Sequence, residues 1–172
     1  MAVHILLLRA VNVGGTGKLP MAELKAMCED AGFSRVQTYI ASGNVVFETS
    51  MPPKEIRAAI ESRLRAYAGK PVGVHLRTVA EMEAVLKANP FRKAAPNRTV
   101  AIFLEEPPLK GALAEVTGLT EEELHLGSRE IYVTYGDGMA HSKLRIPAAK
   151  AGTARNMNTV AKLVALASSL GK

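Results

Sequence analysis

An apolar run from Val3 to Leu8, followed directly by a glycine-rich segment, constrains the fold of this chain most strongly. Apolar side chains occupy both alternating sets of the run, with His4 the one exception. This pattern is typical of a strand at the centre of a sheet that is covered on both faces. Gly14, Gly15 and Lys18 then lead into an expected helix, and such a turn can direct backbone N–H groups toward an anion.

The periodicity of the rest of the chain predicts an α+β protein. Residues 21–31 and 56–67 repeat at helical spacing, and the segments 36–41, 45–49 and 72–76 alternate as strands. The resulting order of strand, helix, strand, strand, helix, strand is the split βαβ, or ferredoxin-like, plan. Ser42, Gly43 and Asn44 join two of the strands as a tight hairpin.

The second half begins to repeat this order, with a strand at 100–104, a helix opened by Pro107, a hairpin over 124–135 and a final helix. We therefore predict two ferredoxin-like (βαββαβ-type) halves, the second incomplete, that share a core. Residues 1–78 form the first half, 79–98 a linking helix and loop, and 99–172 the second α+β half with a basic C-terminal segment. The second half is the expected cover for the open face of the first sheet, and a homodimer partner is the alternative.

Composition limits the classes of protein to which this chain can belong. A chain of 172 residues with 48% hydrophobic side chains can bury roughly 70% of the surface that it exposes when unfolded. No apolar run approaches the ~18 residues of a membrane span, and the single cysteine, Cys28, has no partner for an internal disulfide. We expect a cytoplasmic protein that does not associate with membranes. The four histidines are far apart in sequence, so neither a metal site nor a cofactor is predicted.

The net charge of +6 lies entirely in the C-terminal segment. Residues 1–137 carry equal numbers of basic and acidic side chains, whereas no Asp or Glu follows Asp137. A block of one sign attracts phosphate-bearing partners. Nucleic acid is therefore one candidate partner, although the first strand has no aromatic side chain to stack on bases. A solvated basic face without a partner explains the segment equally well.

Three blocks of sequence resemble the bacterial family of domain of unknown function 1697. They are Leu7 to Gly15 with Pro20 to Leu24, Thr38 to Phe47, and Gly138 to Leu144 with Thr153 to Val160. The resemblance implies a two-part α+β architecture and supplies no established activity. The stretch from Arg145 to Gly152 is shorter than in longer members of the family, so a helix expected there is curtailed.

The glycine-rich segment does not match the phosphate-binding motifs that it superficially resembles. A nucleotide-hydrolase loop requires Gly, four residues, then Gly-Lys and Ser or Thr, but Asn12 and Leu19 stand at the first and last of these positions. Magnesium-dependent hydrolysis is thus not expected. What remains is a donor-rich turn whose candidate ligand-binding residues are Arg9, Asn12, Gly14, Gly15 and Lys18. A plain connecting loop is the alternative.

Two further groups complete the candidate site. Ser42 and Asn44 present a hydroxyl and an amide, although a hairpin turn alone accounts for them. Ser142, Lys143, Arg155 and Asn156 form a polar, cationic set able to hold a carboxylate or phosphate. In an alternative interpretation, Arg155 pairs with a carboxylate of the first half. Asn158 or Thr159 is the expected N-cap of the last helix.

The leading hypothesis is a binding protein for a small phosphorylated or carboxylated ligand, held between the glycine-rich segment and the set around Arg155. A weak, sequence-tolerant RNA or DNA binder is the first alternative. A metal-independent enzyme acting on a phosphorylated metabolite, with Arg9, Lys18 or Lys143 as electrophile, is the second. No catalytic residues are assigned, because no general base is apparent.

Overall fold

The computed structural model describes residues 1–12 and 18–171 and divides the chain into two compact units. The first comprises residues 1–82 and 163–172, and the second comprises residues 83–162. Helix α4 (Met157–Leu170) begins in the second unit and ends in the first. None of the helices in the described residues is both long enough and apolar enough to cross a membrane.

The first unit is an antiparallel four-stranded sheet with two helices. Its elements in chain order are β1 (Ala2–Leu8), α1 (Met21–Asp30), β2 (Ser34–Tyr39), β3 (Asn44–Thr49), α2 (Pro53–Ala68) and β4 (Val74–Thr78). The strands lie in the order β2-β3-β1-β4, and helix α3 (Val79–Lys87) follows β4 directly. The predicted hairpin over residues 42–44 is confirmed, since β2 and β3 pair antiparallel.

Strand β1 occupies the centre of this sheet, as its doubly apolar pattern predicts. It pairs antiparallel with β3 on one side and with β4 on the other. Ile5, Leu6, Leu7 and Leu8 are all fully buried. A strand without a solvated face contributes apolar area from both of its alternating sets, which stabilises the centre of the fold.

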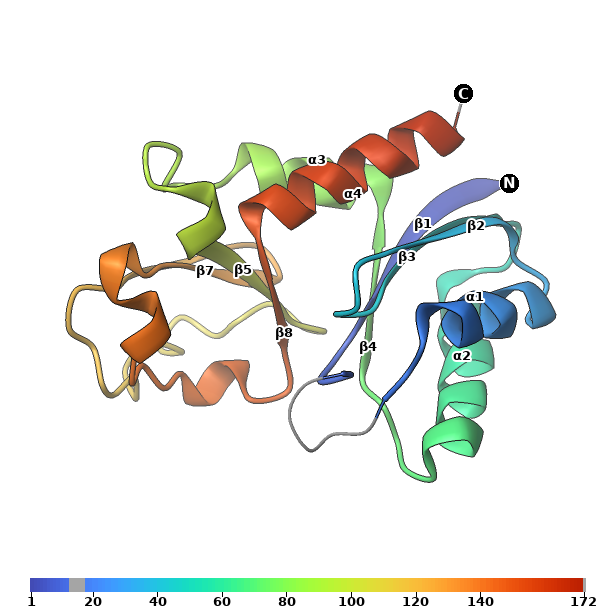
Figure 1. Ribbon diagram of the computed structural model, residues 1–172. Coiled ribbons are helices and arrows are strands. Elements are labelled where there is room, and N and C mark those ends of the chain that lie inside the picture. Colours follow the sequence, from blue (N-terminus) through green and yellow to red (C-terminus); the bar gives the residue numbers. More distant parts are fainter. Residues whose placement is uncertain (13–17, 172) are drawn as a thin grey trace. The chain divides into compact units, whose positions relative to one another are not determined.

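Helices α1 and α2 cover one face of the sheet and form the core of the first unit (Figure 1). Leu6 and Leu8 of β1 pack in one cluster with Leu24 of α1 and Ile60 of α2. Helix α2 stops where Gly69 adopts the left-handed conformation, with φ of +74°, and its N–H bonds to the carbonyl of Arg65 at 2.9 Å. This turn directs residues 70–73 back toward the end of β1.

The second unit contains a second antiparallel four-stranded sheet. Its strands are β5 (Thr99–Phe103), β6 (Glu123–Leu126), β7 (Glu130–Thr134) and β8 (Thr153–Asn156), in the order β6-β7-β5-β8. Three 3-10 turns accompany them, η1 (Pro96–Arg98), η2 (Gly136–His141) and η3 (Pro147–Ala149). Apolar side chains of β5 and β7, including Ile102 and Ile131, form the core cluster.

One local prediction for the second half is wrong, and one strand of this half was not predicted. The segment after Pro107 forms successive turns with i to i+3 bonds, such as Ala112 N–H to Leu109 O at 2.9 Å, and not a helix. Gly111 weakens helix formation there, and the backbone of Thr117 pairs with that of Arg145. Strand β8 was not predicted, because its sequence of Thr, Ala, Arg and Asn lacks an apolar alternation.

Candidate functional site

The end of β1 and the β2–β3 turn meet at the same end of the first sheet. The N–H of Leu8 donates to the carbonyl of Gly43 at 2.8 Å, and Nδ2 of Asn12 donates to the carbonyl of Ala41 at 2.8 Å. The sequence alone left open whether the hairpin and the glycine-rich segment share one end of the sheet. One backbone bond and one bond from the side chain of Asn12 therefore connect the hairpin to the end of β1 and the residues that follow it.

Asn12 holds the two ends of the glycine-rich segment together. Its Oδ1 accepts the N–H of Leu19 at 2.7 Å, and its Nδ2 donates to the carbonyl of the same residue at 2.8 Å. Asn12 has φ of +55°, a left-handed conformation that Asn tolerates better than most residues. The side chain therefore positions Leu19 and its neighbour Lys18. The candidates Gly14 and Gly15 lie outside the described residues.

The hairpin candidates have internal roles as well. Asn44 is fully buried, and its Nδ2 donates to the carbonyl of Tyr39 and to Oγ of Ser42, both at 2.9 Å. These bonds stabilise the turn that presses Gly43 against Leu8. Ser42 and Asn44 thus shape the end of the sheet through contacts within the hairpin.

Arg9 is placed by the segment that precedes β4. Its N–H donates to the carbonyl of Gly73 at 2.9 Å, and a Cβ at Gly73 would lie 3.3 Å from Cβ of Arg9. The absence of a side chain at Gly73 lets the stem of Arg9 lie directly against the backbone. Residues 70–73 are in this way held beside the residues that leave β1.

A cavity of about 640 Å³ lies within the first unit, lined by the end of β1, by Lys18 and Leu19, by the last turns of α2 and by residues 70–73. Its described lining includes no residue of the β2–β3 turn. Its volume lies within the range of roughly 300–1,000 Å³ that is usual for small-molecule sites. Buried or half-buried core side chains line its inner part, namely Val11, Leu19, Leu64 and Val72. The exposed side chains of Arg9, Lys18, Tyr67 and Lys70 line the remainder. The cavity therefore combines an apolar floor with a cationic rim.

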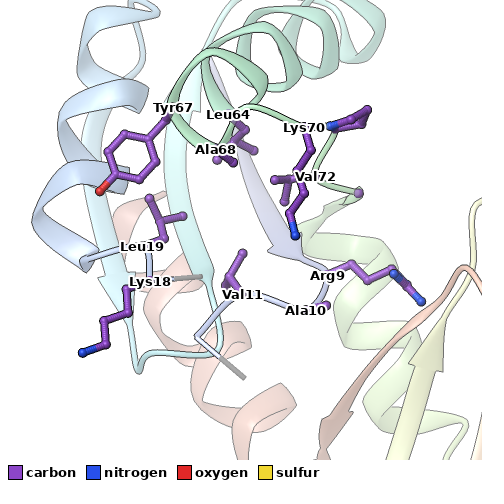
Figure 2. A pocket seen from close by; sticks show the side chains of 12 residues that line it. Arg9, Ala10, Val11, Lys18, Leu19, Leu64, Tyr67, Ala68, Lys70 and Val72 are labelled. Atoms are coloured by element: carbon purple, nitrogen blue, oxygen red, sulfur yellow. The ribbon is translucent and has the colours of Figure 1, made fainter. Parts of the chain in front are cut away.

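The charges around this cavity have a single sign. Arg9, Lys18 and Lys70 contribute three cations, and none of the described residues that line the cavity is Asp or Glu. Lys18 lies on the side of Leu19 and Tyr67, whereas Arg9 lies on the opposite side, with Val11 between them (Figure 2). A smaller hollow of about 380 Å³, which shares Pro71 and Val72 with this cavity, includes both an acidic and a basic side chain.

Ser142 and Lys143 belong to the second unit. Oγ of Ser142 donates to the carboxylate of Glu122, which also accepts the backbone N–H of Thr120 at 2.8 Å. These hydrogen bonds lower the pKa of Glu122 to about 2. The bond from Ser142 has the largest effect, and the bond from the backbone N–H of Thr120 has the next largest. The hydroxyl of Ser142 therefore ties two loops of this unit together. The side chain of Lys143 is exposed.

Arg155 and Asn156 have structural contacts in strand β8. Arg155 is buried and donates to Oγ1 of Thr153 at 2.7 Å and to the carbonyl of Ala154 at 2.9 Å. Desolvation lowers the pKa of its guanidinium to about 10. Oδ1 of Asn156 accepts the N–H of Thr159 at 2.9 Å and so caps α4. The predicted cap at Asn158 or Thr159 is wrong by two residues or more, because α4 begins at Met157.

Tyr67 and Lys70 were not identified from the sequence. Both lie at or just beyond the C-terminal end of α2, in a region without a motif. For Lys70 the sequence offers one signal, a cation directly after Gly69, the glycine that ends the helix. For Tyr67 it offers none. Nothing in the sequence indicates that Lys70 lines the same cavity as Arg9, because this depends on how residues 70–73 return to the sheet.

The described residues do not support metal binding or a nucleophilic thiol. No group of three or more His, Cys, Asp or Glu side chains is arranged to hold a metal ion there. Cys28 is buried in the core of the first unit, and desolvation raises the pKa of its thiol to about 12. The thiol is therefore protonated near neutral pH and is not a nucleophile.

Comparisons with known proteins agree with the expected family. The family model described as "Protein of unknown function (DUF1697)" matches residues 1–132. Among solved structures, the chain is similar to the conserved bacterial protein SP0830 from Streptococcus pneumoniae, with 25% identity and a TM-score of 0.78 over 96% of this chain and 98% of that one. A search of curated proteins finds no match. Since the family model spans more than half of the chain, the protein belongs to the DUF1697 family.

Proposed function

We propose that the protein binds a small anionic ligand, phosphorylated or carboxylated, in the cavity at the end of β1. The observation that carries this proposal is the placement of Arg9, Lys18 and Lys70 around one cavity whose lining includes no carboxylate. An anion entering it meets cations from three separate segments and no acidic side chain. Arg adds a planar fork suited to carboxylate or phosphate, and Lys adds a point charge.

The exposure of these cations limits the affinity that they supply. All three are on the surface, where a single ion pair contributes only about 0.2–1 kcal/mol. Salt screens such pairs over a Debye length of about 10 Å at 0.1 M. We therefore expect modest affinity that falls as the ionic strength rises, with further binding energy from the apolar floor.

The other predicted residues have indirect roles in this proposal. Asn12, Ser42 and Asn44 are not among the described residues that line the cavity. Asn12 bonds to Leu19, which lines it, and Ser42 and Asn44 bond within the hairpin that contacts Leu8. The set formed by Ser142, Lys143, Arg155 and Asn156 is left out, since Ser142 and Arg155 donate to partners within the second unit and Oδ1 of Asn156 accepts the N–H of Thr159 there.

Isothermal titration calorimetry with ribose 5-phosphate and with pyrophosphate tests the proposal. The double variant Lys18→Gln, Lys70→Gln removes two rim charges, and Lys25→Gln, Lys54→Gln removes two exposed charges from α1 and α2 of the same unit. We expect the first variant to weaken binding by about 2- to 30-fold, the sum of two surface ion pairs. The control variant retains the affinity of the parent protein.

Thermal unfolding supplies an independent measurement. A ligand at 100 times its dissociation constant stabilises the protein by about 2.7 kcal/mol, which raises Tm by roughly 5–10 °C for a chain of this size. Absence of binding by both anions overturns the proposal. Equal losses in the two double variants overturn it too, because they would show attraction to overall charge without a defined site.

Nucleic-acid binding through the C-terminal segment is a second candidate. Lys143, Arg145, Lys150 and Lys162 are exposed, and no acidic side chain follows Asp137. Backbone contacts of this kind predict a mobility shift of RNA or DNA that weakens steeply with salt. An enzymatic role on a phosphorylated metabolite remains a weaker hypothesis, because no general base lines the cavity.

We also infer that both units are variants of the ferredoxin-like plan. The support is the chain order β1, α1, β2, β3, α2, β4 in the first unit and the matching sheet orders β2-β3-β1-β4 and β6-β7-β5-β8. In the second unit, turns replace the two helices that would connect the strands. An experimental structure with a different strand order in either sheet would contradict this inference.

A further inference from the structure

We infer that the ligand of the cavity is a mononucleotide or a closely similar compound, in which a flat aromatic ring is joined to a phosphate. This inference rests on the proposed function and adds to it the chemistry of the uncharged part of the ligand. It depends on three features of the cavity, namely its floor, the aromatic side chain at its mouth, and the separation of its cations.

The floor of the cavity favours a ligand with an apolar body. Val11, Leu19 and Leu64 are at most 6% exposed and belong to the core of the first unit, and Val72 packs against them. An inorganic anion would contact the rim alone. A ligand with a flat ring also contacts the small apolar surface that these side chains present to the cavity, and this contact adds to affinity.

Tyr67 provides an aromatic surface beside that floor. It lies in the last turn of α2, 47% exposed, on the same side of the cavity as Leu19 (Figure 2). A large aromatic side chain at the mouth of a cavity offers a π-face to a planar ring. Stacking of a base on an aromatic side chain contributes about 1–3 kcal/mol per base, as alanine substitutions show.

Two of the three cations, Arg9 and Lys70, suit a ligand with a phosphate at the end away from Tyr67, and Lys18 lies on the side of Tyr67 (Figure 2). Arg9 lies across the cavity from Tyr67, with Val11 between them, and Lys70 comes from the segment that follows α2 (Figure 2). A ring stacked on Tyr67 leaves its phosphate directed toward the side of Arg9 and Lys70. A sugar phosphate satisfies the cations equally well but lacks the ring, so the two classes of ligand are separable by experiment.

The test compares ligands that differ by one group. Dissociation constants are measured by calorimetry for the four nucleoside 5′-monophosphates, for ribose 5-phosphate and for the corresponding nucleosides. We expect at least one monophosphate to bind about 5- to 150-fold more tightly than ribose 5-phosphate. Tyr67→Ala lowers this ratio, because only the floor then contacts the ring, whereas Tyr67→Phe, which keeps the ring, preserves it. Circular dichroism confirms that both variants fold, as expected for an exposed position.

Tyrosine fluorescence gives a second readout, because the chain contains no Trp and four Tyr. Stacking of a base on Tyr67 quenches part of this emission, and the quenching is absent in Tyr67→Phe.

The outcomes separate this inference from the proposed function. Equal affinities for ribose 5-phosphate and all four monophosphates, or a ratio that survives Tyr67→Ala, overturn the inference and leave anion binding in place. Binding of nucleosides as tight as that of their monophosphates supports the ring contact and contradicts the anion proposal. Absence of binding by every compound removes both.

Discussion

Replacing Gly43 by Ala tests whether the β2–β3 turn sets the position of the end of β1. Gly43 has φ of +90°, and a Cβ built there would lie 2.8 Å from Cβ of Leu8 and 2.9 Å from Cγ2 of Val11. Both neighbours are buried, and Val11 lines the cavity. A methyl group at this position therefore strains the backbone and also displaces β1 and the residues that follow it.

The expected loss in the free energy of unfolding is the sum of two effects. A left-handed backbone costs a residue with a Cβ roughly 1–2 kcal/mol, and overpacking of a well-packed core costs about 1–3 kcal/mol. We therefore expect Gly43→Ala to lower the free energy of unfolding by about 2–5 kcal/mol. Gly69 is a matched control, because its φ is +74° but a Cβ there would have nothing within 4 Å. Gly69→Ala is expected to cost about 1–2 kcal/mol, from backbone strain alone.

Urea unfolding monitored by circular dichroism measures both variants, with Tm as a second observable. A change of 1 kcal/mol corresponds to about 2–4 °C for a chain of this length. The denaturant slope should stay constant, which shows that the difference arises in the folded state. Equal destabilisation by the two substitutions would refute the argument, because it would mean that the contacts of Gly43 with Leu8 and Val11 contribute nothing.

Two further predictions concern buried or bridging polar groups. Asn12→Ala removes three hydrogen bonds, to Leu19 and Ala41. Each contributes about 0.5–1.5 kcal/mol before discounting for exposure. We therefore expect urea unfolding to show a free energy of unfolding that is lower by about 1.5–3 kcal/mol. Asn12→Gly, which keeps the left-handed backbone without strain, should be less destabilised than Asn12→Ala. Burial lowers the pKa of His4, whose ring stacks on Phe47 and whose Nδ1 has no hydrogen-bond partner within the described part of the chain. The unfolded state therefore binds the proton more readily, so stability falls as the pH drops below about 6.5, and a His4→Leu variant with an unchanged slope between pH 7 and 5 would contradict this.

Much of the first unit was predictable because its signals are local. The uninterrupted apolar run of β1 indicates a strand covered on both faces, and the Ser-Gly-Asn turn indicates a hairpin between strands of matching alternation. The second half is less regular. Pro107 suggested a helix that does not form, since Gly111 and the pairing of Thr117 with Arg145 favour turns.

Strand β8 escaped prediction for a related reason. Its pairing with β5, and not an apolar pattern of its own, makes residues 153–156 a strand. Arg155 therefore looked like a free cationic donor in the sequence. In the structure it is buried, and its guanidinium donates to Thr153 and Ala154.

Some residues of the candidate site were likewise predictable from the sequence, and others were not. Arg9 and Lys18 were identified because they flank the glycine-rich segment, and both line the cavity. Tyr67 was not identified, because it reaches the cavity only through the packing of α2 on the sheet. Lys70 was not identified either, because it reaches the cavity only when Gly69 turns the chain back and the carbonyl of Gly73 bonds to the N–H of Arg9. Sequence patterns report local conformation, and they do not report which distant turns meet.

By itself the sequence determined the family, the α+β class and the central position of β1, since these depend on composition, periodicity and short motifs. Tertiary structure alone decided that the end of β1, the last turns of α2 and residues 70–73 line one cavity. It also decided that this cavity has three cations and an apolar floor, because the side chains that line it come from segments separated by dozens of residues. Only the pairing of strands and the packing of α2 on the sheet bring those segments within reach of a single ligand.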